Sequence, residues 1–246
     1  MMSPSAAATA LLTNRNPAAI DGFLGGHGVD LDRLRDLAEM LAVAEGLSLT
    51  IHRVIEDGDW AVVHATQTGL ASGPLVVFDV MRVVDGRIVA HHDAAAAMAP
   101  PNPSGRTQVD GPVAVGDPGL TDTSRALVRD FVESILIGAR YDELPRFIAG
   151  DDYAQHNSQI ADGLSGLGAA LDALAAQGLA MVYTTLHQVV AQGHFVFTRS
   201  TGRLGDTPMA YFDLFRVDHG KIVEHWDIMQ PIPADRLRFG SAPQRA

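Results

Sequence analysis

Two carboxylates and a histidine near the end of the chain have the types and spacing that acid/base chemistry requires. His225 and Asp227 lie two residues apart in KIVEHWDIM, a run of β-branched and aromatic residues that predicts a strand. Side chains two apart in a strand point to the same face. Asp213, in the predicted strand MAYFDLFRV, would lie near the level of Asp227 or His225 if the segment DHG makes a tight hairpin turn.

This arrangement predicts a general base if the shared face lines an apolar cavity. A carboxylate that loses hydration has a raised pKa, which makes it a competent base toward a carbon acid next to a carbonyl. Tyr211 and Phe215 share the face of Asp213 and would form part of the wall. Two structural alternatives stay open: Asp213 could form a surface pair with Arg216, and His225 could simply donate to a backbone carbonyl.

The elements that position these residues occur twice in the chain. FDVMRVVDGRIVAHHD, residues 78–93, returns as FDLFRVDHGKIVEHWD, residues 212–227, with nine of 16 positions identical. The similarity extends back to segments that begin at His52 and His187. The repeat predicts two copies of one small domain, at residues 1–105 and 120–246. A linker at 106–119 would lie within a stretch from 98 to 123 that is rich in proline and glycine.

Each copy reads as helices followed by a meander of strands, which predicts an α+β fold. In the second copy, residues 124–136 place apolar side chains on one helical face. A short helix at 141–148 and a third helix from Leu164 to Gly178 follow, and strands begin near 183. Helices packed on one side of a curved antiparallel sheet would leave an apolar cone. The first copy has no counterpart of His156, whether or not residues 15–22 are aligned with residues 156–163. Residues 1–7 are expected to be disordered.

Composition excludes several classes of function. The net charge of −11 disfavours nucleic acid and anionic membranes as partners. No apolar run reaches membrane-spanning length and the start lacks a basic signal segment, so we expect a cytoplasmic protein. The chain has no cysteine, which excludes disulfides, thiolate metal sites and cysteine nucleophiles. Phosphate loops, dinucleotide fingerprints and nucleophile elbows are also missing.

We therefore expect no cofactor. We also expect no metal, because no tight spacing such as HExxH occurs in the sequence. Ligands could come from His91, His92 and Asp93, or from His156, His225 and Asp227.

The second copy resembles the SnoaL-like (polyketide cyclase-like) group of the nuclear transport factor 2-like superfamily. The similarity is carried by YAQHN followed by ADG, by FDLFRVDHGKIVEHWD and by QPIP, and it extends more loosely over the first copy. The resemblance implies two tandem cone-shaped domains of the cystatin-like or nuclear transport factor 2-like fold. Members of the superfamily include polyketide cyclases, ketosteroid isomerase, scytalone dehydratase, limonene epoxide hydrolase and non-catalytic modules, so the fold alone fixes no reaction.

The resemblance also suggests roles for individual residues. Asp227 matches the acid or base of the SnoaL-like cyclases, with a structural ion pair as the alternative. His156 and Asn157 match a motif that lines the cavity, with a hydrogen-bonded corner as the alternative. We expect Asp213 and His156 to share or relay the proton, Asn157 to donate to an oxyanion, and His225 to assist Asp227. The expected substrate-binding side chains are Tyr153, Tyr183, His187, Tyr211 and Phe215.

The expected function is cofactor-independent proton abstraction from a small apolar carbonyl compound in the second domain. The overall reaction would be an aldol-type cyclisation, an isomerisation or a dehydration, so the enzyme would be a cyclase, isomerase or lyase. The alternatives are a non-catalytic small-molecule-binding or assembly module and an enzyme similar to epoxide hydrolases. We expect the two domains to form an internal pseudo-dimer, with a homodimer also possible.

The first domain is expected to be a shortened, degenerate scaffold. Asp79, Arg82, His91 and Asp93 repeat the pattern of the second copy, but the histidine of the HN motif is missing.

Overall fold

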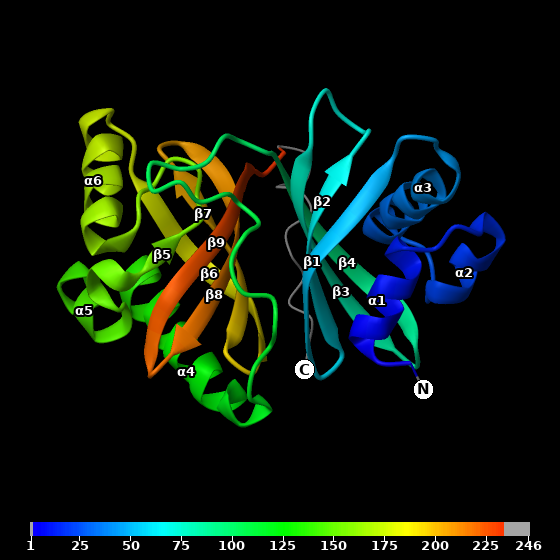
Figure 1. Ribbon diagram of the computed structural model, residues 1–246, viewed down its shortest axis with the longest axis horizontal. Coiled ribbons are helices and arrows are strands. Elements are labelled where there is room, and N and C mark those ends of the chain that lie inside the picture. The colour runs from blue at the N-terminus through cyan, green and yellow to red at the C-terminus, as the bar shows by residue number, and fades with distance from the viewer. Residues whose placement is uncertain (1, 234–246) are drawn as a thin grey trace.

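The protein, described here from a computed structural model, folds into two α+β units that lie side by side (Figure 1). The structure describes residues 2–233; residue 1 and residues 234–246, the end of the second predicted domain, lie outside the described residues. In each unit helices cover one face of an antiparallel sheet. The two sheets lie back to back in the centre, with helices on the outer sides. No helix within residues 2–233 is long and apolar enough to cross a bilayer.

The first unit has three helices followed by four strands. The helices are α1 (Pro4–Leu12), α2 (Ile20–Phe23), preceded by the 3-10 turn η1 (Pro17–Ala19), and α3 (Val29–Val43). The strands β1 (Ser48–Asp57), β2 (Trp60–Thr68), β3 (Leu75–Val84) and β4 (Arg87–Ala97) pair in chain order. The expectation of disorder over residues 1–7 is wrong from Pro4 onward. Ser3 caps α1, and Ala7 and Ala8 are fully buried against the sheet.

The second unit has more elements before its sheet. A 3-10 turn η2 (Pro118–Leu120) leads into α4 (Thr121–Phe131), which continues as the π-helical turn η3 (Val132–Ile137). Then follow η4 (Tyr141–Glu143), α5 (Leu144–Phe147), η5 (Gly150–Asp152), the short strand β5 (Ala154–Gln155) and α6 (Gly163–Ala176). The long strands are β6 (Met181–Gln192), β7 (Phe195–Leu204), β8 (Thr207–Asp218) and β9 (Lys221–Pro231). The sheet order is β5-β9-β8-β7-β6, with β5 parallel to β9.

Three large apolar cores follow from the alternation of side chains along these strands, beside a smaller cluster of Tyr183, Met209 and Tyr211. One lies between the first sheet and α1 to α3, and another lies between the second sheet and α4 to α6. The third core joins the opposite faces of the two sheets. Phe78 and Phe197 meet there with ring centroids 5.6 Å apart, and Phe212 and Leu214 add to the contact. The two units therefore pack sheet to sheet, which leaves the helix-covered face of each sheet free to form a cavity.

The strand register sets the level of the acidic residues in both units. Asp213 pairs directly with Asp227 across β8 and β9, which is one of the two levels, Asp227 or His225, that the hairpin left open. Asp79 pairs with Asp93 in the same way across β3 and β4. In each hairpin the residue before the turn glycine has a positive φ, 52° at Asp85 and 46° at His219, which is the left-handed conformation that a tight hairpin needs.

Candidate functional site

A cavity of about 290 Å³ lies between α6, α4 and the inner face of the second sheet. Its apolar wall comes from leucines and alanines of α6 and from Phe131, Phe215, Met181 and Met229. Its polar groups are Tyr153, Gln155, Asn157, Gln159, Gln177, Tyr183, Asp213, His225 and Asp227. The size is at the lower end of small-molecule sites in proteins.

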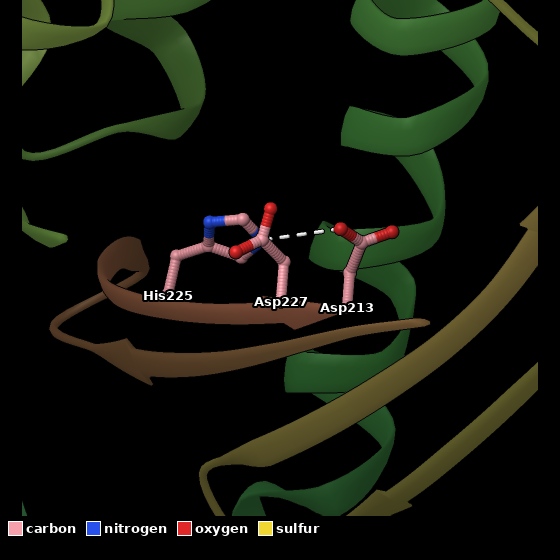
Figure 2. Close-up of side chains that lie close together, drawn as sticks. All are labelled: Asp213, His225 and Asp227. Carbon is pink, nitrogen blue, oxygen red and sulfur yellow. Dashed lines mark hydrogen bonds and ion pairs between the residues drawn. The ribbon is translucent and has the colours of Figure 1, made fainter. Parts of the chain in front are cut away.

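Three ionisable side chains stand together on the floor of this cavity. Figure 2 shows Asp213, His225 and Asp227 rising from the same face of β8 and β9. Nε2 of His225 lies 3.2 Å from Oδ1 of Asp213, and the side chains of these two residues are 12% and 1% exposed. Asp227 is partly buried and reaches the cavity wall. The structure thus brings together the histidine and both carboxylates that strand periodicity had placed on one face.

Asn157 holds the Asp227 carboxylate in place. Its amide nitrogen lies 3.0 Å and 2.8 Å from the two carboxylate oxygens of Asp227. Burial raises the pKa of Asp227 above its ordinary value, and the negative charge of Asp213 raises this pKa further. The charge of His225 and the Asn157 hydrogen bond both lower the Asp227 pKa. The net direction is upward. Asn157 was expected to donate to an oxyanion, but here its amide is engaged with the base itself.

His225 lies between two acceptors. Its Nδ1 is 3.2 Å from Oε1 of Gln155, and its Nε2 faces Asp213. Burial disfavours the charged ring, but the hydrogen bond to Asp213 and the charges of Asp227 and Asp213 outweigh it and raise the His225 pKa. Both ring nitrogens can donate in this arrangement, so it suits an imidazolium. Tyr183 donates to Asp213 over 3.2 Å and completes the support of that carboxylate.

The same three side chains are the group best placed to hold a metal ion among the described residues. Asp213, His225 and Asp227 each offer one ligand atom, and these atoms lie within 4.8 Å of one another. A cation would have to displace the Asp213 or the Gln155 hydrogen bond of His225.

His156 does not line the cavity. Its side chain is fully buried on the opposite face of the sheet, where its ring stacks on Trp226 with centroids 4.5 Å apart. Nε2 lies 2.9 Å from Oε1 of Glu224, and Nδ1 lies 2.7 Å from both the Thr107 carbonyl oxygen and Oδ1 of Asp110. The expectation that His156 shares a proton with Asp213 therefore does not fit this geometry. Asn157, the next residue, turns toward the cavity instead.

His156 belongs to a buried polar cluster that joins the two units and the linker. Glu224 also accepts from Nε of Arg216 at 2.6 Å. Its two partners, His156 and Arg216, both lie on the face of the sheet opposite the cavity. From the first unit, the guanidinium of Arg53 lies 4.3 Å from the centre of the Trp226 ring. Arg53 also donates to the carbonyl oxygens of Val109, Asp110 and Pro112 in the linker. This cluster fixes how the linker and the first sheet sit against β9.

The predicted substrate-binding residues divide into two groups. Tyr153, Tyr183 and Phe215 line the cavity. Tyr211 lies behind Tyr183, stacked on it with ring centroids 4.0 Å apart, and does not reach the cavity wall. His187 is exposed and lies 2.8 Å from the hydroxyl oxygen of Thr201, away from the cavity. Strand periodicity could not place His187, because bulges interrupt β6 after Tyr183 and after Leu186. Tyr211 does share the face of Asp213, but Tyr183 lies against it.

Gln155 is a central residue that the sequence did not indicate. Its Oε1 accepts from the backbone N–H groups of His156 and Asn157, each at 2.9 Å, in addition to facing His225. Its Nε2 donates to the Tyr153 hydroxyl at 3.3 Å. The segment between β4 and the linker holds Gln155 from outside, because the Asn102 side chain donates to the Gln155 carbonyl oxygen at 2.7 Å. A glutamine in a buried strand, beside the HN pair, was the available signal.

The first unit lacks this supporting segment. Leu24 forms a β-bridge with Ile88 just as Ile148 forms one with Ile222, so the two units correspond up to that point. The second unit then forms β5, whereas the first goes on to α3 without a fifth strand. Residues 15–22, which precede Leu24, therefore do not correspond to residues 156–163.

Comparisons with known proteins agree with two copies of one domain. The family described as SnoaL-like domain matches residues 10–91 and 128–225. No curated relative matches the chain. Among solved structures, a candidate ketosteroid isomerase from Kribbella flavida is similar at 19% identity and TM-score 0.38, covering 51% of this chain and 94% of its own.

Two further solved structures show the same coverage. A SnoaL-like polyketide cyclase from Agrobacterium tumefaciens is similar at 17% identity and TM-score 0.35, covering 47% of this chain and 97% of its own. An LEH-like epoxide hydrolase from M. tuberculosis is similar at 23% identity and TM-score 0.34, covering 45% of this chain and 84% of its own. Each neighbour thus has about the length of one unit.

Proposed function

We propose that this chain, which belongs to the SnoaL-like domain family, is an acid/base enzyme that removes a proton next to the carbonyl of a small apolar compound. The second-unit cavity would be the active site and Asp227 the base. One observation carries the proposal: a carboxylate with a raised pKa stands at the wall of a largely apolar cavity, with an amide holding it in position. Such a group can accept a proton from carbon near neutral pH.

In the proposed first step the carbon–hydrogen bond next to the carbonyl breaks and the proton passes to Asp227. The electron pair of that bond moves into an enolate, so negative charge develops on the carbonyl oxygen. A donor at this oxygen stabilises the transition state. Tyr153 suits that role, because its hydroxyl oxygen accepts from Gln155 and keeps its own proton to donate. Burial, together with Asp227 and Asp213, raises the Tyr153 pKa well above its ordinary value, which keeps the phenol protonated.

His225 and Asp213 would balance the charge of the step. As an imidazolium, His225 provides a positive charge beside the enolate, and Asp213 with Tyr183 holds the ring in orientation. Proton return to a different carbon gives an isomerisation, attack of the enolate on a second carbonyl gives an aldol-type cyclisation, and loss of a β-hydroxyl gives a dehydration. The base, the donor and the charge partner are all side chains, so this step needs no cofactor.

Two alternatives use the same cavity. A binding module would take up apolar ketones without exchanging their protons. Epoxide opening by an activated water is less suited to this site, because Arg216 turns to Glu224 on the other face of the sheet and offers no cation to the cavity.

The test is deuterium incorporation into methyl ketones such as acetophenone, followed by proton NMR in D2O. This assay reports the proposed first step without knowledge of the natural substrate. We expect the unmodified protein to accelerate exchange and Asp227→Asn to lose the acceleration by a factor of about 10² to 10⁴. Asp93→Asn, the matched change in the first unit, is expected to keep it. Binding of acetophenone without exchange would favour the binding module, and equal loss in both variants would overturn the assignment of Asp227.

A further inference from the structure

The first unit contains a cavity of its own, of about 360 Å³, between α3 and the helix-facing side of its sheet. Figure 1 shows α3 lying over that side, away from the second unit. The apolar lining comes mainly from Leu37, Met40, Leu49, Leu70, Leu75 and Val77. Polar groups stand at both ends: Arg33, Asp79, His91 and Asp93 at one, and Gln67 at the other. Asp36 of α3 also lines the cavity. The proposed function does not use this cavity.

At one end, the first unit repeats the floor of the second cavity without its supports. Nε2 of His91 lies 2.8 Å from Oδ1 of Asp79, and both side chains are 4% exposed. Asp93 takes the place of Asp227, but within residues 2–233 no side-chain amide donates to its carboxylate as Asn157 does to that of Asp227. It lies 4.0 Å from Arg33, and its side chain is 35% exposed. This carboxylate is solvated and paired with a cation, so it does not meet the conditions that make Asp227 a base.

At the other end, Gln67 offers an unused hydrogen-bond donor. The residue is 5% exposed and lines the cavity, and its Nε2 has no hydrogen-bond partner among the described residues. Buried donors are almost always paired, because an unpaired one has lost its water without gaining an acceptor. The corresponding position in the second unit is Gly202. Gln67 pairs with Leu75, three residues before Phe78, just as Gly202 pairs with Met209, three residues before Phe212. The amide is therefore particular to the first cavity.

The two ends are far enough apart to fit an elongated ligand. Val63 pairs with Asp79, and Gln67 follows four residues later on the same strand, which is roughly 13 Å along the sheet. Between these levels the wall is apolar. The carboxylates of Asp36, Asp79 and Asp93 outnumber the possible cations, Arg33 and His91, so an anionic ligand is disfavoured.

From this geometry we infer that the first unit holds a second, non-catalytic site for a small neutral compound with an apolar body and a carbonyl oxygen that accepts from Gln67. The site does not depend on the proposed function of the second cavity. It differs from that cavity in its recognition group, an amide in place of the Asp227 and Tyr153 pair.

The two sites can be observed separately through methionine methyl groups. Met40 lines the first cavity, whereas Met181 and Met229 line the second. We would titrate protein labelled with ¹³C at the methionine methyls with acetophenone, and in parallel with ethylbenzene, which has a similar body but no oxygen. The Met40 signal is expected to shift and saturate with acetophenone, and ethylbenzene is expected to bind there about fivefold more weakly, the loss of about one neutral hydrogen bond.

Gln67→Leu is the matched variant, because it keeps the shape of the side chain and removes only its polar atoms. It should weaken acetophenone at Met40 about fivefold, to the level of ethylbenzene, and leave the Met181 and Met229 response unchanged. A Met40 signal that does not move, or equal affinity for the two probes in the unmodified protein, would overturn the inference even if Gln67→Leu failed to fold. Shifts at Met181 and Met229 report the second cavity, so failure of one site is distinct from failure of the other.

Discussion

His156→Phe should destabilise the protein while leaving proton abstraction intact. The change keeps a ring that can stack on Trp226 and removes every hydrogen bond of the imidazole. Glu224, only 2% exposed, would lose its 2.9 Å partner and keep Arg216 alone. The linker contacts at Thr107 and Asp110 would be lost as well.

The size of the effect follows from what remains for Glu224. Removing one partner of a buried charge pair costs about 3 to 5 kcal/mol of unfolding free energy. The Arg216 contact at 2.6 Å still compensates part of the buried carboxylate, and the stacking is kept, so we expect about 3 kcal/mol, at the lower end of that range. A loss of this size is a large fraction of the stability of an ordinary domain.

The assay is urea unfolding followed by the fluorescence of Trp226, in a Trp60→Phe background because the chain has two tryptophans. Glu224→Gln and the double variant complete a mutant cycle, which should give a coupling of at least about 1 kcal/mol between His156 and Glu224. Ketone exchange in folded His156→Phe should match that of the parent. A loss of stability below about 1 kcal/mol, or a well-folded variant without exchange, would refute the structural role and return His156 to the catalytic group.

Two further predictions concern pH. Since the Asp227 pKa is raised in the folded state, the folded protein holds this proton more tightly than the unfolded chain, and the carboxylate costs stability as pH rises through the folded pKa. Asp227→Asn should thus raise the unfolding free energy at pH 7 by about 1 kcal/mol, which raises the Tm by a few degrees, and this gain should vanish in acid. Calorimetry that shows no gain in Tm at pH 7 would contradict the prediction. For His91, burial opposes protonation, but the contact with Asp79 outweighs burial and raises the His91 pKa in the folded state. The stability that protonated His91 gives to the folded protein is therefore complete below the unfolded pKa, and it is lost as pH rises through the folded pKa. Asp79→Asn should therefore cost about 1 kcal/mol more at pH 5 than at pH 9 in urea titrations, and a pH-independent cost would show that His91 stays neutral.

Strand periodicity was sufficient to predict the core of the site. The period of two placed His225 and Asp227 on one face, and the hairpin turn placed Asp213 near the level of one or the other. The strand register then shows that Asp213 lies opposite Asp227. The internal repeat likewise predicted a second Asp79 and His91 pair. These features are local, because each depends on at most two adjacent strands.

The remaining features depend on contacts between distant segments. His156 and Asn157 follow directly after β5, and the first side chain turns to Glu224 and the linker whereas the second turns to the cavity. Only the pairing of β5 with β9 decides which side chain goes where. The role of Gln155 depends on Asn102, which lies between β4 and the linker, 53 residues earlier. Arg53 lies in the first unit and meets Trp226 only after the sheets pack. No periodicity within one segment carries such information.

The most direct test of the account measures two titrations on the same protein. One is the pH dependence of acetophenone exchange, and the other is the ¹³C chemical shift of the Asp227 carboxyl, assigned by comparison with Asp227→Asn. If Asp227 is the base, exchange falls in acid with the same midpoint as the carboxyl titration, and that midpoint lies above the ordinary aspartate pKa. Exchange that persists after Asp227 is protonated, or a carboxyl that titrates as it does in an unfolded peptide, would contradict the central claim.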